Sequence, residues 1–280
     1  MSFIHPSAII DESAVIGEDV YIGPYSIIGP QVTIGDGSRL NSHVVIEGYT
    51  RLGRHCNVSP GAVLGGLPQD HGFGGEISWV EIGDHCQIRE CATVNRASGE
   101  NQITKMGDHC LIMAYSHLGH NCQLGNRVVL ANSAQLGGFV EVGDSAFIGG
   151  VFAAHQFVKI GRLAIISGFS ATRQDIPPFA MAEGRPQAMV VGINRIGLKR
   201  ANFSAEERNR LKKAFQLLFF SRMLGPQAIL AVEEQVEVDS NISELLDFVK
   251  HSKRGIQRVD DRVSVRGRAT DQMEVEITHA

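Results

Sequence analysis

The stretch IGEDVYIGPYSIIGPQVTIG at residues 16–35 has an isoleucine at every sixth position. The same phase runs back to Ile4 and forward to Leu64 without a break, and it resumes between Ile82 and Ile166 with one interruption. A period of six fits neither an α-helix nor an alternating strand, but it is typical of a hexapeptide β-helix, in which each repeat is one short strand and a corner. We therefore predict an all-β fold built as a parallel β-helix.

Two inward-facing positions per repeat line the core of such a helix. A small or β-branched residue recurs four positions after each aliphatic one, and glycine often follows the aliphatic residue directly. Three repeats close one triangular coil, and neighbouring coils lie about 4.8 Å apart. A residue should therefore lie directly beside the residue one coil later, and residues 4–172 should form roughly nine to ten coils of a quasi-one-dimensional prism.

The composition favours a soluble, cytoplasmic protein. The chain has 280 residues, of which 43% are hydrophobic and 20% charged, and its formal charge of -4 argues against a nucleic-acid partner. It lacks an apolar stretch of about 18 residues and a signal-peptide profile, so we expect no stable membrane insertion. Four of the five cysteines fall in the slot for small core residues and are interpreted as core; these are Cys56, Cys86, Cys110 and Cys122.

The chain divides into three parts. Residues 1–190 form the predicted β-helix, with loops at about 66–80 and 97–104 where the repeat is interrupted. Residues 191–255 are predicted to form a small C-terminal α-helical domain. The tail, residues 256–280, is charged and is either an arm or disordered.

Local signals predict the helices of the second domain. Ser204 and Glu207 have the spacing of a capping box, and Gly225-Pro226 is expected to end the helix that begins there. Two further helices are expected at about 227–237 and 241–253. Residues 195–222 contain eight Lys or Arg and two Glu. This basic segment is either a solvated helix face or a docking surface for an acidic or phosphorylated partner.

Three histidines, His117, His120 and His155, are candidates for general-base chemistry near neutral pH. One coil after His120 comes Gly138, and one coil after that comes Gln156. A base beside a glycine N–H suits acyl transfer, because the base takes a proton from the acceptor and the N–H stabilises the oxyanion. Cys122 falls in a core slot, so we expect direct attack by the acceptor. A surface role for His120 and a three-histidine metal site are the alternatives, but the spacing fits a metal site poorly, and we expect none.

Several segments of the chain resemble the UDP-N-acetylglucosamine O-acyltransferases, the first acyltransferases of lipid A biosynthesis. The most specific are HLGHNCQLGNRVVLAN at 117–132, AAHQF at 153–157 and GLKR at 197–200, and the likeness extends over roughly residues 3–255. The resemblance implies a left-handed β-helix and a homotrimer with active sites in the clefts between neighbouring prisms. It also implies a UDP-sugar substrate and an acyl donor carried on the phosphopantetheine of acyl carrier protein, with no other cofactor.

The resemblance assigns roles to individual residues. His120 corresponds to the base and the N–H of Gly138 to the oxyanion donor. His155 would lie along the acyl chain, and Ile165 and Gly168 occupy the position of the family's chain-length ruler. A glycine at 168 predicts a longer acyl chain. The residues that correspond to sugar-nucleotide contacts are Asp70, His117, Gln156, Asn194 and Arg200.

Other positions depart from the family pattern. Asn121 follows the base where aspartate is usual, and Phe139 replaces a histidine that contacts the sugar. Ile196, Ala201 and Gly72 stand where an acidic residue, an arginine and a lysine are expected. Asn121 can orient an imidazole as aspartate does, but it carries no charge. These departures indicate that the sugar or its nucleotide end is held differently.

Three functions follow from this reading. The first is transfer of a (3-hydroxy)acyl chain from acyl carrier protein to the 3-position of UDP-N-acetylglucosamine, with His120 as base and Asn121 as its orienter. The second is N-acylation of an amino sugar nucleotide, such as a 3-amino derivative, because the sister N-acyltransferase of the pathway has His-Asn at this place. The third is a non-catalytic scaffold that binds sugar nucleotide or lipid.

Overall fold

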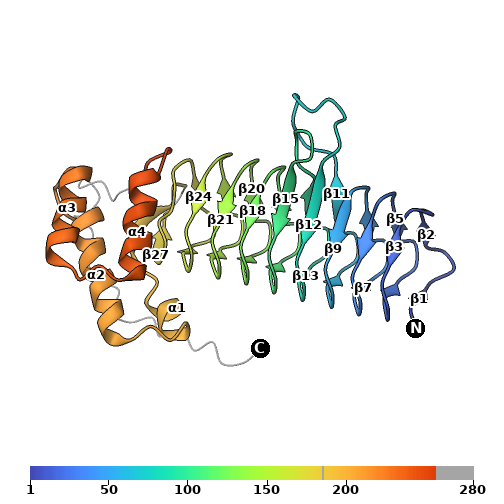
Figure 1. Ribbon diagram of the computed structural model, residues 1–280, viewed down its shortest axis with the longest axis horizontal. Helices are drawn as coiled ribbons and strands as arrows, with labels where there is room; N and C mark the ends of the chain where they lie inside the picture. Colours follow the sequence, from blue (N-terminus) through green and yellow to red (C-terminus); the bar gives the residue numbers. More distant parts are fainter. Residues whose placement is uncertain (185, 257–280) are drawn as a thin grey trace.

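Short parallel strands wind around the three faces of a long prism in the computed structural model, which describes residues 1–184 and 186–256. Figure 1 shows the prism from the side, with helices at its C-terminal end. Among the described residues the three sheets have 11, 9 and 8 strands. The predicted left-handed parallel β-helix is therefore the observed architecture, and its first two faces have nine layers each, the lower end of the expected range.

The strands follow one another from face to face. The first face contains β1 (Phe3–Ile4), β4 (Tyr21–Ile22), β7 (Arg39–Leu40), β10 (Asn57–Val58), β13 (Gln87–Ile88), β16 (Leu111–Ile112), β19 (Val129–Leu130), β22 (Phe147–Ile148) and β25 (Ile165–Ile166). The second contains β2 (Ile9–Ile10), β5 (Ile27–Ile28), β8 (Val45–Ile46), β11 (Val63–Gly66), β14 (Thr93–Asn95), β17 (His117–Leu118), β20 (Gln135–Leu136), β23 (Ala153–Ala154) and β26 (Ala171–Thr172). The third contains β3 (Val15–Ile16), β6 (Thr33–Ile34), β9 (Thr50–Leu52), β12 (Trp79–Ile82), β15 (Ile103–Met106), β18 (Gln123–Leu124), β21 (Glu141–Val142) and β24 (Lys159–Ile160).

The register of the strands confirms the stacking expected from the repeat. Leu118 pairs with Leu136, and Leu136 pairs with Ala154, so each coil advances by 18 residues. These aliphatic side chains are buried and form a core that continues along the prism. Burial of an unbroken apolar column stabilises the stack although each strand is only a few residues long.

Two loops interrupt this regular stacking. Leu52 pairs with Ile82, and the intervening chain, residues 67–78, stands out from the prism between β11 and β12 (Figure 1). A second, shorter loop lies between β14 and β15, at residues 96–102. Because pairing resumes in phase after each loop, the core is not disturbed. The predicted loops at about 66–80 and 97–104 lie at these places.

The corners between the second and third faces have a left-handed backbone. Asn121, Phe139 and Phe157 occupy equivalent places in successive coils, with φ of 60°, 60° and 65°. Such a φ is unfavourable for most residues and is best tolerated by glycine and asparagine. The corner conformation aligns these three side chains in one column along the edge of the prism.

Beyond the last coil the chain turns back and becomes helical. The antiparallel pair β27 (Ala180–Glu183) and β28 (Met189–Ile193) extends the first sheet. The helices are α1 (Arg195–Arg200), α2 (Ala205–Phe219), α3 (Gly225–Gln235) and α4 (Ser240–His251). Figure 1 shows them at the end of the prism, where Nε and Nη2 of Arg162 both donate to Oε2 of Glu244 and join the last coils to α4. No helix among the described residues has the length and apolarity needed to span a bilayer.

The ends of the helices explain one wrong expectation. Ser204 accepts a hydrogen bond from the Glu207 N–H and the Glu207 carboxylate accepts one from the Ser204 N–H, so the capping box is present. However, α2 has already ended at Phe219, and Gly225-Pro226 starts α3, where proline is tolerated because its missing N–H has no helical partner. Ile256 bridges to Asp175, and the rest of the predicted tail lies outside the described residues.

Candidate active site

His120 and Asn121 form the corner that follows β17. Both side chains are buried in the chain, with exposed fractions of 9% and 6%. Nδ1 of His120 lies 2.9 Å from Oδ1 of Asn121. The left-handed backbone of Asn121 turns its amide back toward the preceding imidazole. The corner therefore brings two neighbouring side chains into a histidine–asparagine dyad.

Gly138 lies one coil away, directly under the imidazole. A Cβ built on Gly138 would be 2.5 Å from Nε2 and 2.7 Å from Cε1 of His120, so the ring rests on the bare α-carbon. The N–H of Phe139 donates to the His120 carbonyl at 2.9 Å, which holds the two corners in register. Within the part of the chain that the structure describes, the Gly138 N–H has no hydrogen-bond acceptor. A basic nitrogen and a free amide thus lie together at one corner.

The Asn121 amide is held by the loop between β14 and β15. Its Oδ1 accepts from the Ser98 N–H at 2.9 Å, and its Nδ2 donates to the Ser98 carbonyl at 3.0 Å. The Asn121 N–H also donates to Oγ1 of Thr104 at 2.8 Å. Thr104 lies in β15, in register with Val80, and falls in the small-residue slot of the repeat. Ser98 lies in the loop, where the repeat is interrupted, so nothing in its spacing could have identified it.

Asp70 reaches the same place from the longer loop. The Gly72 N–H donates to its carboxylate at 2.9 Å, and the Ser98 hydroxyl lies beside that carboxylate. The Gly72 bond, with the Ser98 hydroxyl next, holds the pKa of Asp70 below its ordinary value. Glu76 of this loop accepts from the Gly99 N–H at 2.7 Å. The two loops are thus bonded to each other beside the dyad.

His117 lies in β17, on the same face as the dyad. Its Nδ1 is 2.7 Å from Oγ1 of Thr93, one coil away. Burial lowers the pKa of His117, and the nearby charge of His120 lowers it further. A neutral His117 can offer a hydrogen bond to a substrate hydroxyl without adding charge to the site.

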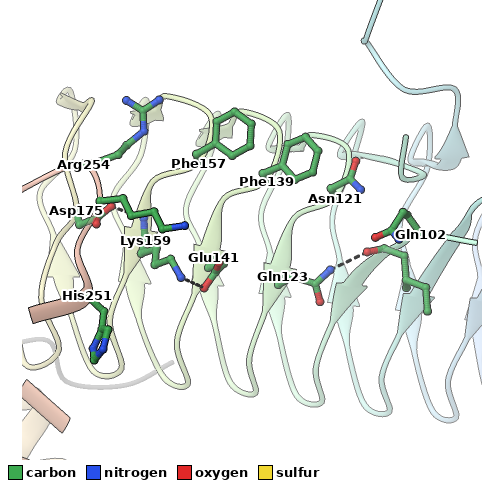
Figure 2. Close-up of a pocket in the computed structure, with 12 residues that line it drawn as sticks. Gln102, Asn121, Gln123, Phe139, Glu141, Phe157, Lys159, Asp175, His251 and Arg254 are labelled. Atoms are coloured by element: carbon green, nitrogen blue, oxygen red, sulfur yellow. Dashed lines mark hydrogen bonds and ion pairs between the residues drawn. The ribbon is translucent and has the colours of Figure 1, made fainter. Parts of the chain in front are cut away.

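Phe139 and Phe157 line the start of a groove that leads away from the dyad. The two rings stack with centroids 4.7 Å apart, and Phe139 meets the His120 ring edge-on at 5.3 Å. The groove has a volume of about 450 Å³ and follows the third face (Figure 2). Gln123, Glu141 and Lys159 form its other side.

The far end of the groove is positively charged. Figure 2 shows Arg254 and Lys159 there, and Lys253, also just after α4, is a further lining residue. The two carboxylates nearby are already engaged: Glu141 pairs with Lys159 at 2.9 Å, and Asp175 accepts from the Lys159 N–H and the Ser252 hydroxyl. This end of the groove therefore suits an anionic group.

His155 and Gln156 occupy the next corner along the same edge. Both are exposed, and Nδ1 of His155 lies 2.9 Å from Nη2 of Arg254. Since arginine is only a donor, this contact uses the lone pair of Nδ1 and leaves Nε2 as the protonated nitrogen. The corner order His120, Gly138, Gln156 is the one expected from the repeat.

Four predicted site residues lie elsewhere in the chain. Ile165 is in β25 on the first face, and Gly168 is at the corner that leads to the second face, which is a different edge of the prism. Asn194 and Arg200 are at α1, at the C-terminal end of the molecule (Figure 1). The side chain of Asn194 caps α1 through the Gly197 N–H and donates to the Leu163 carbonyl at 2.8 Å. Its polar atoms are used inside this chain.

Cys122, the cysteine next to the dyad in the sequence, is buried in the core. Burial raises the pKa of the Cys122 thiol to about 12, which leaves it protonated near neutral pH. Across residues 1–184 and 186–256, no three His, Cys, Asp or Glu side chains are grouped so that they could hold a metal ion. The dyad and Gly138 thus remain the arrangement with catalytic geometry.

Two family models match the chain. The model for domain 2 of UDP N-acetylglucosamine O-acyltransferase matches residues 175–257, and the model for bacterial transferase hexapeptides matches residues 13–48 and 103–138. A curated relative from Thermodesulfovibrio yellowstonii, an acyl-[acyl-carrier-protein]–UDP-N-acetylglucosamine O-acyltransferase, is 47% identical over 259 residues, which are 92% of this chain and 100% of the relative.

Solved structures of the same kind have closely similar folds. The UDP-N-acetylglucosamine acyltransferase of Francisella novicida superposes with a TM-score of 0.90 at 32% identity, covering 99% of this chain and 100% of the other. The enzyme of Bacteroides fragilis, also a UDP-N-acetylglucosamine acyltransferase, gives a TM-score of 0.89 at 35% identity, covering 91% and 100%. The likeness therefore includes both the prism and its helical end.

Proposed function

The chain belongs to the family of UDP-N-acetylglucosamine O-acyltransferases, and we infer from this that it transfers an acyl chain from acyl carrier protein to UDP-N-acetylglucosamine, the first step of lipid A biosynthesis. The acceptor is the 3-hydroxyl of the sugar and the donor chain is a (3-hydroxy)acyl group. The observation that carries this proposal is the His120 imidazole resting on Gly138 beside a free N–H.

The residues at this corner can perform each step. Nε2 of His120 takes the proton from the acceptor hydroxyl as its oxygen attacks the thioester carbonyl. The carbonyl oxygen becomes an oxyanion, to which the Gly138 N–H donates. When the intermediate collapses, the carbon–sulfur bond breaks and the imidazolium returns its proton to the leaving pantetheine thiolate. His120 ends the cycle neutral, and no covalent acyl-enzyme forms.

The proposed site is completed by a neighbouring copy of the chain. Within one chain, His120 and the ruler residues Ile165 and Gly168 lie on different edges of the prism, and Arg200 lies at its end. A homotrimer with parallel prisms places one edge of each copy beside another edge of the next. A protein that sediments as a monomer in analytical ultracentrifugation and still has full activity would contradict this arrangement.

The acceptor atom is the point on which the alternatives differ. The names of the relatives favour a hydroxyl, whereas the uncharged Asn121 keeps an amine acceptor open. Purified protein should be given acyl-acyl carrier protein with UDP-N-acetylglucosamine, and in parallel with its 3-amino analogue, and the products resolved by mass spectrometry. Product from the hydroxyl sugar supports the proposal. Product only from the amine would replace the proposal with N-acylation. No product from either sugar would favour the non-catalytic binding scaffold.

The acyl chain should be long, because Gly168 has no side chain to block the ruler position. We expect kcat/KM to rise with donor length through at least the medium-chain range in a series of acyl-acyl carrier proteins. Gly168 also packs closely, since a Cβ there would lie 2.8 Å from the Gly150 carbonyl oxygen. Close packing of the backbone therefore also favours glycine at position 168. A maximum at the shortest chain would contradict the prediction.

The groove along the third face is the proposed path of the phosphopantetheine arm. It runs from Asn121 past two coils to the level of Asp175, roughly 14 Å at the usual strand spacing. The stacked phenylalanines suit the aliphatic parts of the arm, and the cations at the far end suit its phosphate.

Removing the Arg254 guanidinium should therefore weaken donor binding. Since a hydrogen bond to a charged group contributes about 1.5–3 kcal/mol, Arg254→Ala should raise the donor KM by about tenfold or more with little change in the KM for UDP-N-acetylglucosamine. Lys250→Ala is the matched control, because Lys250 pairs with Glu233 outside the groove. A rise confined to the UDP-sugar KM would instead place the nucleotide at this end.

A further inference from the structure

We propose that Ser98 is a positioning residue for the reaction: its backbone N–H and carbonyl hold the Asn121 amide in one orientation, so that His120 carries its proton on Nδ1. These two backbone contacts are called the Ser98 clamp, and the Ser98 hydroxyl lies beside the Asp70 carboxylate. The proposal rests on the proposed function, because it concerns the resting state of the base. It is carried by three hydrogen bonds that leave only one orientation of the amide.

The orientation of the Asn121 amide follows from its two contacts with Ser98. The Ser98 N–H can only donate, so the atom that faces it must be the oxygen Oδ1. The Ser98 carbonyl can only accept, so the atom that faces it must be the nitrogen Nδ2. A flipped amide would set two donors against each other and two acceptors against each other. The backbone of one loop residue thus determines which way the amide points.

This orientation determines the tautomer of His120. Oδ1 of Asn121, an acceptor, lies 2.9 Å from Nδ1, so Nδ1 must carry the proton in the neutral ring. The lone pair is then on Nε2, which is the ring atom nearest to where a Cβ on Gly138 would lie. The basic nitrogen and the oxyanion donor therefore face the same space before any substrate binds.

The clamp also explains why asparagine suits this chain. An aspartate at 121 could still accept from His120 and from the Ser98 N–H. Its second oxygen, however, would take the place of Nδ2, 3.0 Å from the Ser98 carbonyl oxygen, with no hydrogen between them. Two acceptors at this distance repel, and a buried carboxylate without its donor is costly. The uncharged dyad is therefore matched to the loop.

The hydroxyl of Ser98 provides a separate connection. It lies beside the carboxylate of Asp70, which corresponds to a sugar-nucleotide contact of the family. Binding of the sugar at Asp70 and orientation of the base thus share one residue, through different atoms. The titratable groups that interact with His120 from these elements are Asp70 of the loop and His117 of β17, and His71 interacts with Asp70.

Two substitutions separate the two connections. Ser98→Ala keeps both backbone groups and loses the hydroxyl, so we expect a several-fold rise in the KM for UDP-N-acetylglucosamine with kcat and its pH profile unchanged. Asn121→Asp loses the donor to the Ser98 carbonyl, so we expect kcat to fall about tenfold or more and the acidic limb of its pH profile to move. This fall is expected although aspartate is the residue usual at that position.

The tautomer of His120 can be measured by NMR spectroscopy without any acyl transfer. In protein labelled with ¹⁵N in its histidine rings, His120 should show a protonated Nδ1 and an unprotonated Nε2 in the resting state. Ser98→Ala should keep this pattern, and Asn121→Ala should lose it. A protonated Nε2 in the wild-type protein, or an Asn121→Asp enzyme as active as the wild type with the same pH profile, would overturn the proposal. Absence of any acyl transfer in the wild type would instead overturn the proposed function.

Discussion

His120→Ala is expected to lower kcat by about 10²–10⁴-fold, the usual contribution of a general base. The substitution removes the only ring nitrogen that lies over Gly138, so the acceptor hydroxyl must lose its proton to water. The substrates do not depend on the imidazole for most of their contacts, and their KM values should change much less. Single-turnover measurements with labelled acyl-acyl carrier protein would isolate the chemical step.

A second histidine provides the control for this experiment. His109 is exposed and stacks on His85 with centroids 4.9 Å apart, at the corner between the third and first faces. His109→Ala should therefore leave kcat within about twofold of the wild type, since surface changes away from the site are usually small. A His120→Ala protein that keeps a tenth or more of the activity would remove His120 as the base. Circular dichroism and sedimentation should show that both variants keep the fold and assembly.

The repeat made most of the prism predictable. A period of six determines which side chains face inward, and a coil of 18 determines which corners are neighbours, so His120, Gly138 and Gln156 could be placed in one row before any coordinates were known. In a solenoid each repeat contacts mainly its neighbouring repeats, so the neighbours of a residue follow from its place in the repeat. Sequence arithmetic therefore carries more spatial information here than in a fold with irregular contacts.

The loops could not be predicted in the same way. Ser98 and Asp70 meet at the dyad because two insertions fold back over one corner, and no period relates their positions. The end of the chain shows a related limit. Gly225-Pro226 fits either the end of one helix or the start of the next, and in the structure α2 ends earlier, at Phe219, so that the pair starts α3. In both cases long-range contacts decide, and local residue preferences do not.

The departures from the family pattern acquire a structural meaning at the corner. Phe139, which the resemblance sets against a histidine of the family, packs its ring between the His120 edge and Phe157. It replaces a polar contact with an apolar wall beside the base. Asn121 replaces a charge with an amide that the Ser98 backbone holds on both sides. The two changes make the surroundings of the base less polar, which strengthens the hydrogen bonds that remain.

Gly138→Ala is the second substitution for which we expect a large loss, at least about 10²–10³-fold in kcat, since losing an oxyanion donor alone has that effect. The added methyl would lie 2.5 Å from Nε2 of His120. The imidazole must then move, and the methyl covers the space where the oxyanion would meet the Gly138 N–H. The donor and the base are lost together, so kcat should fall more than either KM rises.

Gly192→Ala is the matched control, because a Cβ at Gly192 meets no atom within 4 Å and its backbone requires no left-handed conformation. It should leave the kinetics unchanged. A double variant with His120→Ala distinguishes the two sources of the loss at Gly138. If the methyl acts only by displacing the imidazole, Gly138→Ala should cost nothing further once the ring is absent. If the Gly138 N–H stabilises the oxyanion independently, the double variant should be slower than His120→Ala alone, and this second result is the one that the free amide at the corner predicts.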